Sequence, residues 1–172
     1  MKFPYRFSFV TRISHNGPIY FRLAKKGEPL ISNIKSKISF GKANYIEHGD
    51  DLNILFTGNA SDIAIEVYKA LTKNNIREAN LVSMHTLKPF DTNSINKIIQ
   101  RGKPIFTIEE HSVIGGLGSI ISEYIAESDK NPIFKRFALP DEYSHYVGSQ
   151  KYLRGKFRLT SKKIIEDIEY LI

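Results

Sequence analysis

From residue 50 onward, the hydrophobic positions along the chain alternate between two periods. Short continuous apolar runs recur with a spacing of about 25 residues, which is typical of strands separated by helices. Each run is short enough to form a buried strand, and the first ends at a glycine, Gly58. The expected strands are residues 52–58, 81–85, 105–108 and 133–139.

Between these runs, apolar residues follow the spacing of one face of an α-helix. Asn59 or Ser61 is suited to begin the first helix, because its side chain can accept a hydrogen bond from a free backbone N–H. Asp91 and Thr160 are suited to begin two later helices, and Gly102 to end the second. The residues that the last helix is expected to bury are Ile164, Ile168, Leu171 and Ile172.

Alternating strands and helices predict a mainly parallel sheet with right-handed crossovers. Residues 39–48 predict one more strand, which the turn at residues 48–51 joins to the strand that follows. A connection that short permits only an antiparallel hairpin. The expected fold class is therefore α/β: a doubly wound, mainly parallel five-stranded sheet with one antiparallel edge strand and helices on both faces.

The first 37 residues do not show this alternation of strand and helix patterns. Residues 17–23 have the pattern of a strand, and residues 25–29 resemble the polar start of a linker. We therefore divide the chain into residues 1–37, which look like the end of another unit, and residues 38–172, which form the α/β domain.

The segment with the most candidate chemistry is residues 107–119, where a strand passes into a helix. Ligands bind at that position in α/β sheets, and free N–H groups at a helix start can hold an anion. The third glycine of a dinucleotide motif is missing, and no lysine follows as in a phosphate loop. Close packing on a neighbouring element or module is the other interpretation. The candidate residues for an interface or an anion-binding loop are Glu110, His111, Gly115, Gly116, Gly118 and Ser119.

Glu109, Glu110 and His111 are residue types that serve acid–base and metal chemistry. Consecutive residues at a strand end point to alternate sides of the sheet, whereas a metal ion needs ligands that converge on one point. We therefore assign no catalytic residue and no metal ligand to this segment.

The charge balance, 25 Lys and Arg against 18 Asp and Glu, gives a formal net charge of +7. The densest basic stretch, residues 151–158, contains Tyr152 and Phe157, an arrangement that a single-strand nucleic-acid binder can use. No nucleic-acid motif accompanies it, and a solvated basic face is the simpler interpretation. We expect no nucleic-acid partner.

Cysteine is absent, so neither disulfides nor thiolate metal sites can form. The sequence has no apolar run of about 18 residues, the length that predicts a membrane-spanning helix. The first residues also lack the apolar stretch of a signal peptide. These features predict a cytoplasmic protein without a membrane partner.

Several motifs occur in an order that resembles the C-terminal domain of the transketolase family. They are residues 17–23, 108–119, 139–143 and 147–154, followed by the ending Leu159-Thr160. The resemblance runs from about Gly17 to Ile172. The segment Tyr152-Leu153-Arg154 favours transketolase over deoxyxylulose-phosphate synthase and the β subunit of 2-oxoacid dehydrogenases, which share this domain.

The resemblance implies an enzyme that transfers a two-carbon ketol unit between phosphosugars. Its cofactor, thiamine diphosphate with Mg²⁺, is held between a diphosphate-binding module and a pyrimidine-binding module, while the C-terminal domain makes dimer and interdomain contacts. Residues 17–23 match the last strand of the pyrimidine-binding module, whose catalytic glutamate would precede Met1. The resemblance thus implies no cofactor-binding residue in this chain, which is expected to be inactive alone. Its expected partner is a second copy, in a homodimer, or a companion chain with the cofactor modules.

Gly49-Asp50-Asp51, with Asn74-Asn75 downstream, partly matches the Gly-Asp-Gly…Asn motif that binds the magnesium diphosphate in this family. Asp51 stands where that motif has its second glycine, and the triplet fills an expected turn. We assign no Mg²⁺ ligand there.

The alternative function comes from a different class of protein. The chain would be a stand-alone interaction or regulatory module that binds a small anion at the Gly-rich loop, residues 115–119.

Overall fold

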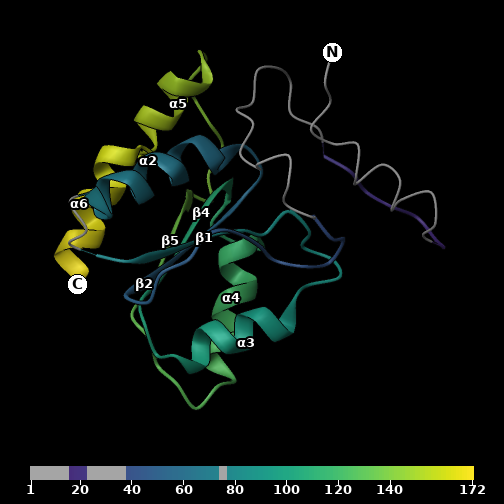
Figure 1. Ribbon diagram of the computed structural model, residues 1–172. Helices are drawn as coiled ribbons and strands as arrows, with labels where there is room; N and C mark the ends of the chain where they lie inside the picture. The colour runs from purple at the N-terminus through teal and green to yellow at the C-terminus, as the bar shows by residue number, and fades with distance from the viewer. Residues whose placement is uncertain (1–15, 23–37, 74–76) are drawn as a thin grey trace.

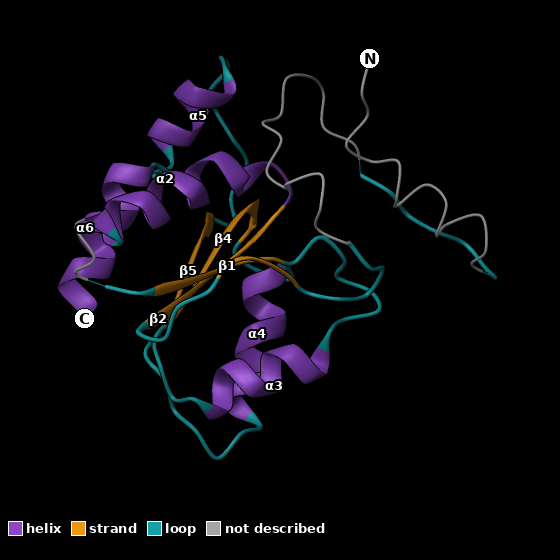
Figure 2. Ribbon diagram, in the orientation of Figure 1, coloured by secondary structure: helices purple, strands orange, loops and turns teal. Residues whose placement is uncertain are grey.

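A five-stranded sheet with helices on both faces organises the chain (Figures 1 and 2). The computed structural model describes residues 16–22, 38–73 and 77–172. The strand order is β1-β3-β2-β4-β5. The strands are β1 (Asn44–Glu47), β2 (Leu52–Thr57), β3 (Ala79–Ser83), β4 (Ile105–Ser112) and β5 (Phe134–Leu139). The helices are the short 3₁₀ helix η1 (Gly58–Ala60), α2 (Ser61–Leu71), α3 (Thr92–Gln100), α4 (Leu117–Ala126), α5 (Gln150–Lys156) and α6 (Ser161–Leu171).

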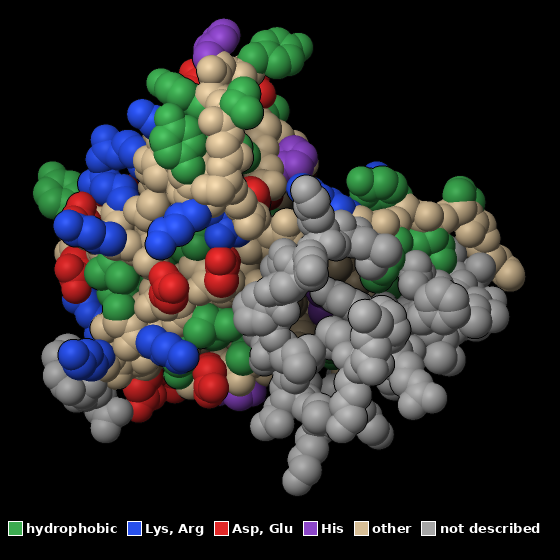
Figure 3. Space-filling view, turned by 90° about the horizontal axis from the view of Figure 1, so that it is seen from above, with side chains coloured by type: hydrophobic (Ala, Val, Ile, Leu, Met, Phe, Trp, Pro, Cys, Tyr) green, Lys and Arg blue, Asp and Glu red, His purple; other side chains and the backbone are tan. Residues whose placement is uncertain are grey.

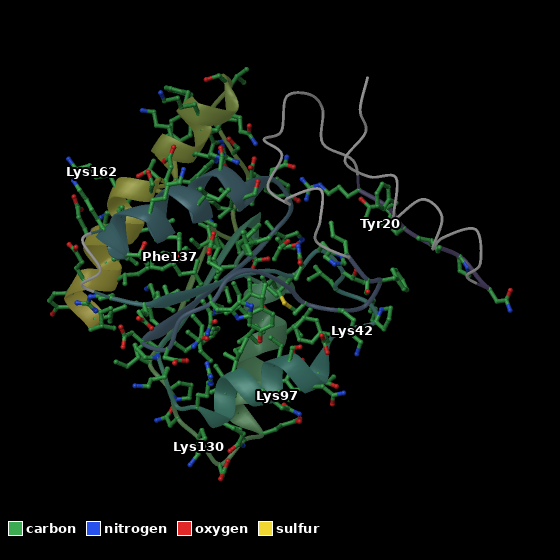
Figure 4. All side chains as sticks on the ribbon, viewed as in Figure 1. Tyr20, Lys42, Lys97, Lys130, Phe137 and Lys162 are labelled. Atoms are coloured by element: carbon green, nitrogen blue, oxygen red, sulfur yellow. The ribbon has the colours of Figure 1, made fainter. Side chains whose placement is uncertain are left out.

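Two apolar cores lie on opposite faces of the sheet, because successive side chains of a strand point to opposite faces. Ile54 and Phe56 of β2 pack with α2 and α6, whereas Leu55 packs with α3 and α4. Phe137 of β5 joins the first core and points into the layer between the sheet and the helices α2 and α6 (Figure 4). The expected doubly wound α/β fold is therefore confirmed.

The edge strand β1 is antiparallel as expected, but its expected neighbour is wrong. It pairs with β3, with Asn44 opposite Ser83, and not with β2 in a hairpin. Residues 48–51 cross the start of β3, a distance of two strand spacings, about 10 Å, that a four-residue connection can span.

Contacts with the start of β3 hold this crossing in place. The Asp51 N–H donates to the carbonyl of Glu78 at 2.8 Å. The Gly49 N–H donates to the side-chain oxygen of Asn80 at 3.1 Å. Gly49 also lies so close to the backbone of Ala79 that a Cβ would collide with it. The connection thus rests against the amino-terminal end of β3 and leaves no room for a hairpin.

Two of the expected helix starts are confirmed and one is wrong. The side chains of Asp91 and Thr160 accept hydrogen bonds from the N–H groups of Ser94 and Lys163. At α2, neither Asn59 nor Ser61 caps the helix, because η1 continues directly into it from β2.

The expected burial of α6 holds only for its first part. Ile164 and Ile168 are buried in the core that faces α2, whereas Leu171 and Ile172 are each 37% exposed. The expectation of burial is therefore wrong for those two residues, which are exposed at the end of the helix.

Residues 16–22 form no regular secondary structure, so the strand expected at residues 17–23 is not present in its described part, and Leu23 lies outside the described residues. Most of the proposed unit 1–37 also lies outside them. Among the described residues, no helix has the length and apolar character needed to cross a membrane.

Candidate functional site

The carboxylate of Glu109 lies at the start of helix α4. Glu109 is near the end of β4 and is only 1% exposed. It accepts hydrogen bonds from the N–H groups of Leu117, at 2.7 Å, and Gly118, at 2.8 Å. These are helix-start donors without an intrahelical partner, and a negative charge there is favourable. The chain therefore supplies its own anion to this helix.

The glycines at positions 116 and 118 leave the space that this arrangement needs. A Cβ at Gly116 would collide with the Glu109 carboxylate. A Cβ at Gly118 would lie 2.7 Å from the Arg136 side chain and 2.8 Å from the hydroxyl of Thr107. Both distances are shorter than real Cβ contacts, so β4, β5 and α4 approach one another closely only because these positions have no side chain.

The Gly-rich loop between β4 and α4 is closed by contacts of its own. Arg136 of β5 donates to the carbonyl of Val113 at 2.9 Å. The Ser119 hydroxyl donates to the same carbonyl at 3.2 Å and accepts from the Gly115 N–H at 2.9 Å. Gly115 has a φ of 80°, a left-handed conformation that favours glycine. The loop is thus a fixed turn whose polar groups largely satisfy one another.

Glu110 points away from Glu109 and belongs to a separate network. Its carboxylate accepts hydrogen bonds from Arg154, at 2.7 Å, and from Gln150, at 2.7 Å. Arg154 also donates to the Asp62 carboxylate and the Asn59 carbonyl, both at 2.7 Å. This guanidinium therefore connects η1, the start of α2 and the end of β4 to helix α5, which carries it.

The ionic character of Arg154 is reinforced by its partners. Burial alone would lower the pKa of Arg154, but its hydrogen bonds to Asp62 and Glu110, and their negative charges, raise that pKa above its ordinary value. A planar guanidinium suits this position because it can donate to several acceptors at fixed angles.

Sequence reasoning placed Arg154 in a basic surface stretch and missed this role. The available signal was helical spacing: Gln150 and Arg154 are four residues apart, so they share one face of α5. Glu109 was also missed as a helix cap. Its signal was an acidic residue inside an apolar strand that ends just before a Gly-rich helix start.

The structure does not bring Glu109, Glu110 and His111 together around one point. His111 is exposed, and its ring nitrogen Nδ1 lies 2.9 Å from the carbonyl of Ser112. The two carboxylates have the separate partners given above. Within the described residues, no group of three or more His, Asp or Glu side chains is arranged to hold a metal ion.

The triplet at residues 49–51 lies at the opposite end of the sheet, where β2 begins. Asp50 forms an ion pair with Arg101 at 3.0 Å. The carboxylate of Asp51 accepts the Glu78 N–H at 2.7 Å. Asn74 and Asn75 lie outside the described residues. Both carboxylates of the triplet thus stabilise the crossing from β1 to β2.

A mixed five-stranded sheet with α2 and α6 on one face and α3 and α4 on the other defines a doubly wound α/β domain whose carboxyl edge carries a fixed Gly-rich loop. Residues 41–164 match the family described as transketolase, C-terminal domain. The chain belongs to this family.

Relatives in this family include proteins that are themselves described as parts. The chain is 33% identical over 160 residues to a 6-deoxy-6-sulfo-D-fructose transketolase subunit of Clostridium sp., covering 93% of this chain and 49% of that one. It is 32% identical over 165 residues to a putative transketolase C-terminal section of Methanocaldococcus jannaschii, covering 92% and 51%. The chain therefore spans about half the length of these curated relatives.

A solved structure agrees with these relatives. The structure described as a split gene transketolase, inactive beta4 tetramer, superimposes with a TM-score of 0.85 and 27% sequence identity. The match covers 96% of this chain and 54% of that one.

Proposed function

We propose that this chain is the contact-making C-terminal part of a transketolase-type enzyme. The complete enzyme would use thiamine diphosphate and Mg²⁺ to transfer a two-carbon ketol unit between phosphosugars. The observation that carries this proposal is the pattern of coverage: more than 90% of this chain matches relatives described as a transketolase subunit and a C-terminal section.

The chemistry of the carboxyl edge supports contacts rather than catalysis. The Glu109 carboxylate is bonded to the helix α4 start, and the Glu110 carboxylate to Arg154 and Gln150. A carboxylate that activates a cofactor must be free to face it. We propose that these two carboxylates maintain the structure of this edge of the sheet. The exposed residues His111 and Gly115 would contact a neighbouring domain or chain.

The cofactor is assigned to a different polypeptide or module. The triplet at residues 49–51 does not fit a metal–diphosphate site, because Asp50 is paired with Arg101 and Asp51 with the backbone of Glu78. We therefore assign no catalytic step to the residues of this chain. A small anion at the Gly-rich loop is not part of the proposal either, since Leu117 and Gly118 already donate to Glu109.

The two parts of the chain have separate proposed roles. Residues 38–172 form the C-terminal domain, and residues 1–37 are the end of a pyrimidine-binding module with its linker. A companion chain that carries the rest of the cofactor modules would complete the enzyme.

Mixing tests this function directly. Ketol transfer from a phosphorylated ketose to an aldose phosphate is measured for this chain, for a polypeptide carrying the two cofactor modules, and for both together, with Mg²⁺ and thiamine diphosphate present. We expect activity in the mixture and none with this chain alone. Activity that this chain does not increase would contradict the proposed role.

A further inference from the structure

The segment of residues 141–158, which comprises the loop after β5 and helix α5, lies almost entirely on the surface. All of its residues are exposed except Leu153 and Phe157, which are partly buried, and Arg154, which is buried. None of them belongs to either apolar core. Helix α5 projects from the layer formed by α2 and α6 (Figure 1), and the view from above shows hydrophobic side chains on a projection of the surface (Figure 3). Apolar burial therefore contributes little to holding this segment on the domain.

Polar contacts with the carboxyl edge of the sheet attach the segment instead. At its first end, the Ser112 hydroxyl donates to the Asp141 carboxylate at 3.0 Å. In α5, Gln150 and Arg154 each donate to the Glu110 carboxylate at 2.7 Å. Arg154 is the one buried side chain of this segment and also contacts the start of α2. Its guanidinium is therefore the main attachment.

Contacts within the segment make the loop and α5 one cooperative unit. Tyr146 of the loop packs edge-on against Phe157, with 6.2 Å between ring centroids. The Lys156 ammonium lies over the rings of Tyr146, at 5.1 Å, and Tyr152, at 5.4 Å. The Ser149 hydroxyl accepts the first free N–H of α5, from Tyr152, at 3.2 Å. A helix of seven residues is not stable when it is detached, so release of this segment would unwind α5 as well.

The segment joins the domain at two fixed points. Before it, the Leu139 carbonyl at the end of β5 accepts the Val113 N–H at 2.8 Å. After it, Leu159 is buried in the core that faces α2, and Thr160 caps α6. Arg158, just before the second point, has a φ of 59°, a left-handed conformation that is unfavourable for a residue with a side chain. Unwinding of α5 relieves this strain and leaves both fixed points intact.

The attachment lies where the connections of two neighbouring parallel strands leave to opposite faces of the sheet. β2 pairs with β4, and β2 is followed by α2 on one face while β4 is followed by α4 on the other. Doubly wound domains bind ligands at this position. Here the Asn59 carbonyl and the carboxylates of Asp62 and Glu110 all accept from the guanidinium of Arg154. The chain therefore fills this position with its own side chain.

We propose that residues 141–158 are a lid, latched by Arg154, that opens as a unit while the rest of the α/β domain stays folded. Opening costs less than unfolding the sheet, because it breaks polar contacts and exposes neither apolar core. The closed lid withholds the acceptor groups of Asn59, Asp62 and Glu110, and the open lid exposes them. This inference goes beyond the proposed function and does not depend on it, because it needs no companion chain and no cofactor.

Hydrogen exchange of the full chain, followed by mass spectrometry of its peptides, tests the lid. We expect the amides of α5 to exchange about 100-fold faster, or more, than those of α6, whose Ile164 and Ile168 are buried in the core. The N–H groups of Leu153 and Phe157, which are bonded within α5, should have the same protection. Fraying of the helix would instead free its ends first.

Two variants test the latch and the strained residue in opposite directions. Glu110→Gln removes the charge that faces Arg154 and should raise the exchange rate of α5 about tenfold. Arg158→Gly removes the strain of the closed state and should lower that rate about two- to fivefold. Glu123→Gln is the matched control, because Glu123 is exposed on α4, and it should leave the rate unchanged. Far-ultraviolet circular dichroism checks that each variant is folded.

Three results would each overturn the proposal. The first is an equal exchange rate in α5 and α6 of the wild-type chain, which would mean that the segment opens only when the whole domain unfolds. This comparison needs no variant, so it holds even if a substitution prevents folding. The others are a Glu110→Gln variant whose α5 exchanges no faster than in the wild type, and an Arg158→Gly variant whose α5 exchanges no more slowly.

Discussion

Glu109 and Gly116 depend on each other at the start of α4. The carboxylate reaches the free N–H groups of Leu117 and Gly118 because position 116 has no side chain. A buried carboxylate without donors would be costly, and a helix start without an acceptor would leave N–H groups unpaired. Together, Glu109 and Gly116 allow the buried carboxylate and the free N–H groups of the helix start to pair with each other.

We expect Gly116→Ala to destabilise the fold by about 1–3 kcal/mol, because its Cβ would displace the Glu109 carboxylate. Gly155→Ala is the matched control. A Cβ at Gly155, in helix α5, meets no atom within 4 Å, so this change should be neutral or stabilise by up to about 1 kcal/mol. Urea unfolding measures both. Equal effects of the two substitutions would contradict the close-approach argument.

Asp91 predicts a dependence of stability on pH. Burial alone would raise the pKa of its carboxyl, but hydrogen bonds from Ala43 and Ser94 and the charge of Lys42 lower it below the ordinary value of 3.8. Its ionised form therefore stabilises the folded state above about pH 4, and this contribution is lost as the pH falls through the lowered pKa.

Asp91→Asn removes the charge while retaining a capping side chain. We expect the variant to be less stable than the wild type at pH 7 by about 1 kcal/mol. The gap should narrow at pH values below 3.8, as Asp91 becomes protonated in the wild type. Chemical unfolding at a series of pH values measures it. A gap that stays constant down to the lowest pH at which both remain folded would show that the charge of Asp91 does not stabilise the fold.

At the scale of elements, hydrophobic spacing predicted the four parallel strands, the helices between them and the caps at Asp91 and Thr160. It could not predict that β1 pairs with β3, because the short connection sets the direction of β1 and not its neighbour. Helix α5 was not predicted, because its basic residues were interpreted as a solvent-exposed stretch. Its position depends on the hydrogen bonds of Arg154 to Asp62 and Glu110. Both residues are distant in the sequence, and a local residue pattern carries no information about such contacts.

Arg154 is the residue that attaches α5 to the sheet edge. We expect Arg154→Met to destabilise the fold by about 2–3 kcal/mol, because it leaves Glu110 and Asp62 without their shared cation. Arg154→Lys should restore little of this loss, since an ammonium cannot reach three acceptors in the same way. Lys162→Met, an exposed position on α6 (Figure 4), is the control and should have little effect. Thermal unfolding measures all three, and full stability of Arg154→Lys would contradict the assigned role of the guanidinium.

For the whole molecule, the fold and the family follow from pattern and motif order, and the match to the transketolase C-terminal domain confirms both. Under the proposed function, the residues of this chain hold neither the cofactor nor the substrate. The acidic groups at the carboxyl edge stabilise the structure, and those at residues 49–51 stabilise a chain crossing.

Titration calorimetry with Mg²⁺ and thiamine diphosphate tests most directly whether the cofactor site lies outside this chain. We predict no saturable heat up to millimolar cofactor, because a diphosphate cradle needs several converging oxygen ligands, and Asp50 and Asp51 are bonded to Arg101 and to the backbone of Glu78. Micromolar binding that Asp50→Ala abolishes would contradict this account, since it would place a working cofactor site within the chain itself.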